Sequence, residues 1–166
     1  MTTPQSLRAD WVAIAVGACS LALILGALGF QYLGGLPPCE MCHWQRWPHI
    51  AAAIVGILGG GFLPRRYAVS VVMVTILLVA TSGLIGLWQT GAQYHILPGP
   101  QACTVLHPYI IGSNAPPEAP RCDIPTWFFL GLALPAWNAI FSFLVAFAAI
   151  FLLGKPATSG SEAAEH

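Results

Sequence analysis

Charged side chains are scarce in this sequence. Asp, Glu, Lys and Arg make up only 7% of the 166 residues, whereas a soluble globular domain carries about 25%. Hydrophobic residues make up 57% of the chain. Too little polar surface is left to cover a water-soluble body, so the composition predicts a membrane protein. The formal net charge is zero, which argues against the basic surface that a nucleic-acid partner requires.

The apolar runs also lack the polar–apolar alternation of barrel strands. In lipid the backbone must pair with itself, so we expect helices, each of about 20 apolar residues. The predicted fold class is all-α, a polytopic membrane protein with a four-transmembrane-helix bundle and two outer loops. The first run exceeds the roughly 7–15 apolar residues of a signal peptide, so we expect it to remain as a span. The four predicted spans are about residues 11–33, 44–63, 68–89 and 127–153.

Basic residues predict the orientation of this bundle. By the positive-inside rule, the side richer in Arg and Lys faces the cytoplasm. We therefore expect both termini in the cytoplasm and loops 34–46 and 90–126 outside. Residues 1–153 then form one domain, and the small, polar tail 154–166 is expected to be disordered. The basic residues on the side of the termini are Arg8, Arg65, Arg66 and Lys155, and those on the opposite side are Arg46 and Arg121.

Four of the five cysteines fall in the two predicted outer loops. Cys39 and Cys42 lie in the first loop, and Cys103 and Cys122 lie in the second. An even set of cysteines on an oxidising face indicates disulfide chemistry. Of the three possible pairings, the short spacing favours Cys39 with Cys42, which leaves Cys103 with Cys122. Cys19 lies inside the first span, where a lone cysteine is expected to be a small packing residue.

The pair Cys39 and Cys42 is expected to be redox-active rather than structural. A ring this small gives little loop-closure stabilisation, whereas two intervening residues are the spacing of redox-active pairs. Cys103 and Cys122 are also expected to be redox-active, although they enclose a longer, Pro- and Gly-rich stretch for which a structural staple is a plausible alternative.

Arg46 follows Cys42 by four residues, so both face the same side of a helix that begins near Cys39. The helix N-terminus and the arginine would both favour a thiolate at Cys42. The guanidinium could also hydrogen-bond an oxygen of a bound electron acceptor. The alternative interpretation is an interfacial arginine that snorkels to the membrane surface.

The same stretch permits a second function. Cys39-Glu40-Met41-Cys42-His43 matches C-x-x-C-H, the attachment signature of c-type haem, so the alternative is a membrane-anchored haem electron-transfer protein. The outer loops are short for enclosing a haem, and this function leaves Cys103 and Cys122 without a role.

A zinc site built from the four cysteines has poor ligand spacing, and we predict no metal. A structural protein with disulfide staples is a third possibility.

Three motifs, in this order, resemble the DsbB family of disulfide bond formation proteins. The first is Pro38-Cys39-x-x-Cys42-x-x-x-Arg46, which precedes the short second span. The second is Pro98-Gly99-Pro100-Gln101-Ala102-Cys103. The third is Cys122-Asp123, followed by the run Trp127–Trp137. The resemblance covers about residues 10–153. The combination of the three motifs is more specific than either cysteine pair alone.

The resemblance implies a multi-pass protein of the bacterial inner membrane with periplasmic cysteine loops. It implies an enzyme, a protein-disulfide:quinone oxidoreductase, which reoxidises a periplasmic DsbA-like thioredoxin-fold oxidase. The electrons would pass to a quinone of the membrane, ubiquinone or menaquinone. By the same resemblance the partner attacks Cys103, and Cys122 completes that pair. Cys39 would exchange with Cys122, while Cys42 would lie beside the quinone, with Arg46 as the polarising residue.

Members of the family often carry an acid or a histidine after the third span. Here that region offers Gln93 and His95 as candidate quinone contacts. The prolines of the second loop and Gly112 favour a short interfacial turn at Leu106–Ile111 over the family's membrane-lying helix. Vitamin K epoxide reductases also combine four helices with two cysteine pairs, but their quinone-proximal C-x-x-C belongs to a late helix, and here it precedes the second span.

Overall fold

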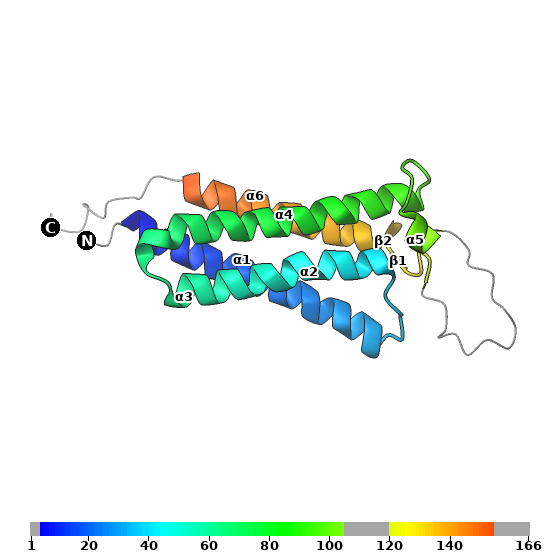
Figure 1. Ribbon diagram of the computed structural model, residues 1–166, viewed down its shortest axis with the longest axis horizontal. Helices are drawn as coiled ribbons and strands as arrows, with labels where there is room; N and C mark the ends of the chain where they lie inside the picture. Colours follow the sequence, from blue (N-terminus) through cyan, green and yellow to red (C-terminus); the bar gives the residue numbers. More distant parts are fainter. Residues whose placement is uncertain (1–3, 105–119, 155–166) are drawn as a thin grey trace, which may run out of the picture.

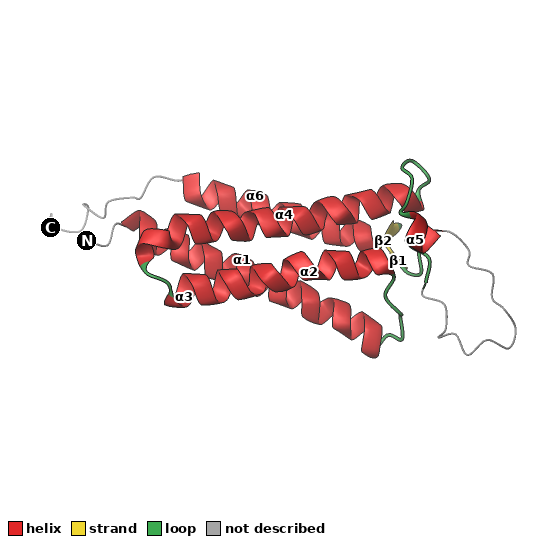
Figure 2. Ribbon diagram, in the orientation of Figure 1, coloured by secondary structure: helices red, strands yellow, loops and turns green. Residues whose placement is uncertain are grey.

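A computed structural model describes residues 4–104 and 120–154 of the chain. These residues form an elongated bundle of helices that lie side by side (Figure 1). Helix dominates the described part, and the loops gather mainly at one end (Figure 2). Two predictions lie outside the described residues: the disorder of the tail beyond Gly154 and the interfacial turn at Leu106–Ile111.

Four helical segments make up the bundle. The first segment begins, and the last segment ends, at the same end of the molecule (Figure 1). The second segment is interrupted by a π-helical turn but stays helical from Glu40 to Phe62. The elements are α1 (Pro4–Tyr32), α2 (Glu40–Ile54), the π-helix (Val55–Gly59), α3 (Gly60–Phe62), a 3₁₀ turn (Arg65–Tyr67), α4 (Ala68–Gln93), α5 (Gln101–Thr104), β1 (Phe128–Phe129), β2 (Leu132–Ala133) and α6 (Leu134–Gly154).

Three helices of the described chain are long and apolar enough to cross a membrane: Arg8–Tyr32, Arg65–Gln93 and Leu134–Gly154. The second predicted span corresponds to α2 and α3, and the π-helical turn divides it into two shorter helices. Large apolar side chains cover the outer surface, as expected where lipid replaces water. The predicted fold class, an all-α membrane protein with a four-helix bundle, is confirmed. Examples of the outward residues are Leu77, Leu84, Leu144, Phe147 and Phe151.

The fourth helix begins later than the sequence indicates. The predicted span starts at Trp127, whereas α6 starts at Leu134. The residues between form a small antiparallel hairpin in which Phe128 pairs with Ala133. Leu130 and Gly131 both have positive φ, 50° and 77°, as a tight two-residue hairpin turn requires. A continuous apolar run does not distinguish a short hairpin from a helix, which is why the sequence pattern missed this turn.

The first two helical segments touch backbone to backbone. A Cβ added at Gly56 would lie 2.6 Å from the carbonyl oxygen of Ala13, and one at Gly17 would lie 2.9 Å from the amide nitrogen of Ile57. Small residues permit this close approach, which is common between membrane helices. The contact holds α1 against the π-helical turn and leaves α1 and α2 to diverge toward the end that carries the cysteine loops (Figure 1).

Candidate redox site

The four loop cysteines come together at one end of the bundle. Cys39, Cys103 and Cys122 are buried in one cluster with Met41, and Cys42 packs against it. Cys39 is 4% exposed and Cys122 is fully buried. The two loops that carry the cysteines are therefore in contact. The end of the bundle that holds this cluster is called the cysteine end below.

Local geometry places Cys39 and Cys42 on one helix N-terminus. Cys39 is the N-cap of α2, in an extended conformation with φ −79° and ψ 172°, as is typical of an N-cap residue. The Sγ atom of Cys39 accepts a hydrogen bond of 3.2 Å from the backbone N–H of Cys42. The sulfur thus replaces the Ser or Asp oxygen of an ordinary N-cap. Both cysteines are free thiols in this arrangement.

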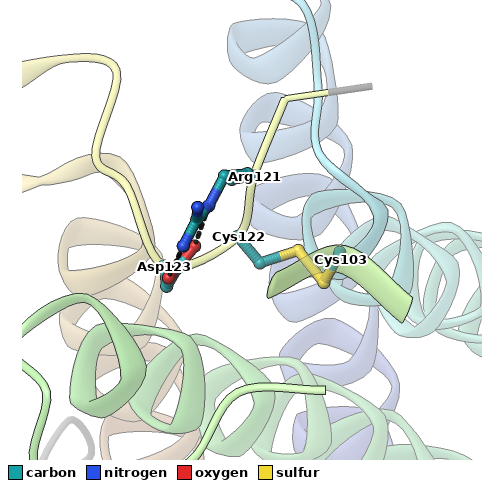
Figure 3. Close-up of polar contacts among 4 residues, drawn as sticks. All are labelled: Cys103, Arg121, Cys122 and Asp123. Carbon is teal, nitrogen blue, oxygen red and sulfur yellow. Dashed lines mark hydrogen bonds and ion pairs between the residues drawn. A yellow bond between two sulfur atoms is a disulfide. The ribbon is translucent and has the colours of Figure 1, made fainter. Parts of the chain in front are cut away.

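Cys103 and Cys122 form a disulfide bond, with their Cα atoms 5.5 Å apart (Figure 3). Cys103 lies on α5, and the backbone N–H of Cys122 donates to the carbonyl oxygen of Cys103 at 2.9 Å. Next to the disulfide, Arg121 donates two hydrogen bonds to the carboxylate of Asp123, at 3.0 and 2.5 Å. These bonds hold the pKa of Asp123 below its usual value, and they shape the loop around Cys122.

The two thiols of the N-terminal pair differ in acidity. The hydrogen bond from the Cys39 side chain lowers the pKa of Cys42 to about 6, and Gln89 and the positive charge of Arg46 lower it further against the opposing effect of burial. The interaction with Cys42 and burial raise the pKa of Cys39 well above its usual value. At neutral pH the pair therefore carries one proton, with the negative charge on Cys42 and the proton on Cys39.

A cavity of about 560 Å³ opens beside Cys39 and Cys42. Most of its lining is apolar and comes from α1, from α6 and from the hairpin before α6. Its polar side chains come from α2, α4, α6 and the loop that carries Cys122. The size and the apolar lining with a few convergent polar groups are typical of a small-molecule site. The polar side chains of the lining are Gln45, Arg46, His49, Gln89, Gln93, Arg121, Thr126 and Asn138.

Aromatic side chains line the cavity between α1 and α6. Successive ring centroids lie 4.9 Å apart between Phe30 and Trp127, 6.0 Å between Trp127 and Phe129, and 5.9 Å between Phe129 and Trp137. The indole N–H of Trp137 also donates to the carbonyl oxygen of Phe129 at 3.1 Å. The hairpin is thereby held onto the start of α6, and its rings form part of the cavity wall.

Arg46 lines the cavity one turn beyond Cys42. Its Nη1 atom donates to Oε1 of Gln31 at 2.6 Å, and its Nη2 atom donates to the carbonyl oxygen of Ala27 at 3.4 Å. Both partners belong to α1, so the guanidinium bridges α1 and α2 where the two helices diverge.

The two candidates after the third span separate in space. Gln93 lines the cavity, and its Oε1 atom is buried without a hydrogen-bond partner in the described structure. His95 is exposed, has a positive φ of 57°, and does not belong to the cavity lining. His43 is exposed on α2. Cys19 is a free thiol that is exposed on α1, away from the cysteine cluster.

Four polar residues of this site are not singled out by the sequence motifs: Gln45, His49, Gln89 and Asn138. Gln45, His49 and Gln89 are almost fully buried, and all four line the cavity. Each lies within a predicted span. Polar residues inside a membrane helix face the bundle interior or a cavity and often mark function. That rule, applied to the polar positions of the second, third and fourth spans, would have found them.

Comparison with known proteins identifies the relatives of this chain. The family model described as "Disulfide bond formation protein DsbB" matches residues 9–152. The chain belongs to the DsbB family. A protein named disulfide bond formation protein B from Aromatoleum aromaticum is 31% identical over 146 residues, covering 81% of this chain and 88% of the relative. The protein of the same name from Marinobacter nauticus is 26% identical over 89% of this chain and 93% of its own length. No solved structure matches the chain significantly.

Membership of the DsbB family agrees with the architecture. The chain is a disulfide bond formation protein with a general disulfide oxidoreductase activity, and its long apolar helices make it a multi-pass membrane protein. The match extends over all four helices and all four clustered cysteines. A third relative, disulfide bond formation protein B 1 from Pseudomonas savastanoi pv. phaseolicola, is 33% identical over 75% of this chain and 77% of its own length.

The acidity of Cys42 predicts its reactivity. Only the thiolate reacts with iodoacetamide, so the alkylation rate of Cys42 should rise with pH around a midpoint of about 6. Below this pH the thiol is protonated and the rate is lost. Cys39 should stay unmodified at neutral pH, because its pKa is raised. The measurement is peptide mass spectrometry of the reduced, quinone-free protein between pH 4 and 9. A Cys42 midpoint near the ordinary thiol value would contradict this account.

Proposed function

We propose that this protein is a thiol:quinone oxidoreductase that reoxidises a periplasmic DsbA-like dithiol oxidase and transfers the electrons to a membrane quinone. The observation that carries the proposal is the common cluster of both cysteine pairs beside a cavity in the lipid-spanning bundle. In the proposed orientation both termini are cytoplasmic and the cysteine end faces the periplasm, in keeping with the excess of basic residues at the opposite end.

The partner would enter at Cys103. A thiolate of the reduced partner attacks the Sγ atom of Cys103, a mixed disulfide forms, and Cys122 leaves as a thiolate with the electron pair. The second thiol of the partner then attacks its own cysteine in the mixed disulfide, which releases the oxidised partner and Cys103. Each step is thiolate attack on a disulfide. Cys103 is 9% exposed and Cys122 is fully buried, which makes Cys103 the more accessible sulfur.

The electrons would then move inward within the cluster. The Cys122 thiolate attacks Cys39 in an oxidised Cys39–Cys42 pair, so a Cys122–Cys39 bond forms and Cys42 leaves as a thiolate. Cys103 next attacks Cys122, which re-forms the outer disulfide and releases Cys39. The described structure has the Cys103–Cys122 disulfide beside free Cys39 and Cys42. This arrangement corresponds to the end of the transfer, with two electrons stored on the inner pair.

The residues around the cavity fit a quinone. The apolar and aromatic walls suit a quinone ring and the start of an isoprenoid tail, and the polar end offers hydrogen-bond donors for a carbonyl oxygen. Arg46 would donate to that oxygen, and Gln93, with its unpaired Oε1 atom, is a second candidate contact. A quinone bound there would accept two electrons and two protons as Cys39 and Cys42 re-form their disulfide. Either ubiquinone or menaquinone meets these requirements.

A membrane acceptor also answers the energetic requirement. A DsbA-type oxidase has a reduction potential of about −120 mV, so only a stronger oxidant can regenerate its disulfide. A lipid-soluble quinone can be this oxidant. A protein that reaches both the lipid and a periplasmic client must place its thiols at the membrane surface. The cysteine cluster at one end of a membrane bundle meets that requirement.

The alternative function, haem attachment through Cys39 and Cys42, is less well supported by the geometry. Cys39 is 4% exposed and is occupied as the N-cap of α2. His43, which would ligate the iron, is exposed on the helix surface. The contact between Cys39 and the Cys103–Cys122 pair is explained by disulfide exchange and has no role in haem binding.

Replacing Cys42 by Ser should abolish quinone-dependent reoxidation of a reduced DsbA-like protein. Without this thiol the inner pair cannot form a disulfide, so the electrons have no exit. The measurement is the rate at which purified protein and ubiquinone-1 reoxidise the reduced partner. Cys19→Ser is the matched control, because Cys19 is exposed on α1 and absent from the cluster. A reoxidation rate near that of the wild type in Cys42→Ser would contradict the proposed function.

Replacing Arg46 by Ala should weaken the use of quinone and spare the exchange between cysteine pairs. The guanidinium lines the cavity beside Cys42, and a hydrogen bond to a charged group contributes about 1.5–3 kcal/mol. The KM for ubiquinone-1 should therefore rise about tenfold or more. The Cys103–Cys122 disulfide should still form. Arg65→Ala, at the opposite end of the bundle, is the control. An unchanged KM with lower protein yield would favour the snorkelling role.

A further inference from the structure

A chain of hydrogen bonds connects the inner cysteine pair with the middle of the bundle. The Nε2 atom of Gln89 donates to Cys39 Sγ at 3.1 Å and reaches Cys42 Sγ at 3.8 Å. Its Oε1 atom accepts from Nε2 of Gln45 at 2.6 Å, and Oε1 of Gln45 accepts from Nδ2 of Asn138 at 2.8 Å. The side chains come from α2, α4 and α6.

The chain ends at His49. The Oδ1 atom of Asn138 lies 3.0 Å from Nε2 of His49, and Oγ of Ser142 lies 3.3 Å from the same nitrogen. His49 is 2% exposed, Gln89 is 1% exposed and Gln45 is 7% exposed. Burying so many polar groups among membrane helices is costly unless each finds a partner. Stabilisation of helix packing explains why these polar contacts exist. It does not require all the hydrogen-bond donors of the chain to point the same way.

The backbone carbonyl of Ser82 fixes that direction. It lies 3.3 Å from Nδ2 of Asn138, and a carbonyl oxygen can only accept a hydrogen bond. The side chain of Ser82 donates to the carbonyl oxygen of Gln45 at 2.9 Å and accepts from the same Asn138 nitrogen at 3.2 Å. The amide of Asn138 therefore points its NH2 group toward Ser82 and Gln45, and its oxygen toward His49.

The remaining orientations follow from Asn138. Because Oδ1 of Asn138 only accepts, His49 must donate from Nε2. Because Gln45 accepts through its oxygen, its NH2 group faces the oxygen of Gln89. The NH2 group of Gln89 is then the part that faces the two sulfur atoms. Every donor in the chain points toward the thiols, and aligned hydrogen bonds of this kind polarise one another.

We propose that Gln89 is a catalytic residue, whose carboxamide NH2 group stabilises negative charge on the sulfurs of Cys39 and Cys42, and that Gln45, Asn138 and His49 are positioning residues that keep this group turned toward them. The inference rests on the proposed function for its role in electron transfer. It concerns residues that neither the cysteine motifs nor the spacing between Cys42 and Arg46 would single out from the sequence.

The direction of the chain matters for disulfide exchange. When the Cys122 thiolate attacks Cys39, a Cys122–Cys39 bond forms, the Cys39–Cys42 bond breaks, and Cys42 leaves with the electron pair. An N–H group directed at the departing sulfur stabilises the thiolate and speeds the step. A reversed carboxamide would present its oxygen to the same sulfur and oppose the charge. The contact with Cys39 contributes most to the lowered pKa of Cys42, and Gln89 lowers it further.

Few charged groups compete with this effect around Cys42. Within the described lining of the cavity, α1, α4 and α6 contribute only uncharged side chains. The titratable or charged groups are Cys39, Arg46 and His49, from α2 and its cap, and Arg121 from the loop that carries Cys122. Gln89→Met leaves all of these groups in place, so a change in Cys42 acidity in that variant can be assigned to the lost NH2 group.

The test is the pH profile of Cys42 alkylation in the reduced, quinone-free protein. Gln89→Met keeps the length of the side chain and removes the NH2 group, and its alkylation midpoint should rise by about one pH unit. Thr90→Val is the matched control: Thr90 follows Gln89 on α4, and its hydroxyl donates to the carbonyl oxygen of Gly86 rather than to either sulfur. Its midpoint should equal that of the wild type.

A second pair of variants tests the positioning role. His49→Leu removes the donor at the origin of the chain and should raise the midpoint, whereas His49→Gln supplies an amide donor and should restore it. A role of His49 in packing alone would leave the midpoint unchanged in both variants. If Gln89→Met does not fold, Gln89→Glu is isosteric, replaces the donor by a carboxylate, and should raise the midpoint by more than one pH unit.

The proposal is overturned if neither Gln89 variant changes the midpoint, if Thr90→Val raises it equally, or if His49→Gln fails to restore it. These outcomes are distinguishable from failure of the proposed function. The alkylation profile involves no quinone and no partner protein, so it can fail while the wild-type protein still reoxidises its partner. Conversely, the profile can behave as expected in a protein that transfers no electrons to quinone.

Discussion

The hydrogen bonds around the N-terminus of α2 are the interactions on which the site depends. The sulfur of Cys39 caps the helix by accepting from the N–H of Cys42, and Gln89 donates to the same sulfur from α4. The cap brings the two thiols together, and their interaction separates their acidities, so that Cys42 holds the negative charge and Cys39 the proton. In such a pair, Cys42 can leave as a thiolate when a cysteine of the second loop attacks Cys39. Cys42 can also donate electrons toward the cavity.

The bundle around this helix end serves to position its neighbours. Glycine contacts hold α1 against the second helical segment far from the cysteines, and Arg46 bridges α1 and α2 where they diverge. The space between them becomes a cavity that the hairpin before α6 closes with aromatic rings. The cysteine cluster brings the Cys103–Cys122 disulfide against Cys39. The inner pair thus has both a disulfide partner and an apolar cavity as neighbours.

The sequence predicted the four helical segments of the bundle and the position of Arg46 one turn after Cys42, because long apolar runs and short spacings are local signals. The hairpin at Phe128–Ala133 was missed, since an apolar run contains no mark of where a helix starts. Gln45, His49, Gln89 and Asn138 were missed for another reason. Their significance lies in contacts among three helices, which no spacing within one helix reveals. Likewise, only the packed structure separates Gln93, at the cavity, from exposed His95.

The central claim is that the two cysteine pairs form one exchange path through Cys39 and Cys122. Disulfide mapping of the Cys42→Ser, Cys103→Ser double variant tests it most directly. Both remaining cluster cysteines are buried together, so after mild oxidation peptide mass spectrometry should find Cys39 linked to Cys122. The opposite result, with Cys39 and Cys122 both free or with Cys39 linked to Cys19, would contradict the account.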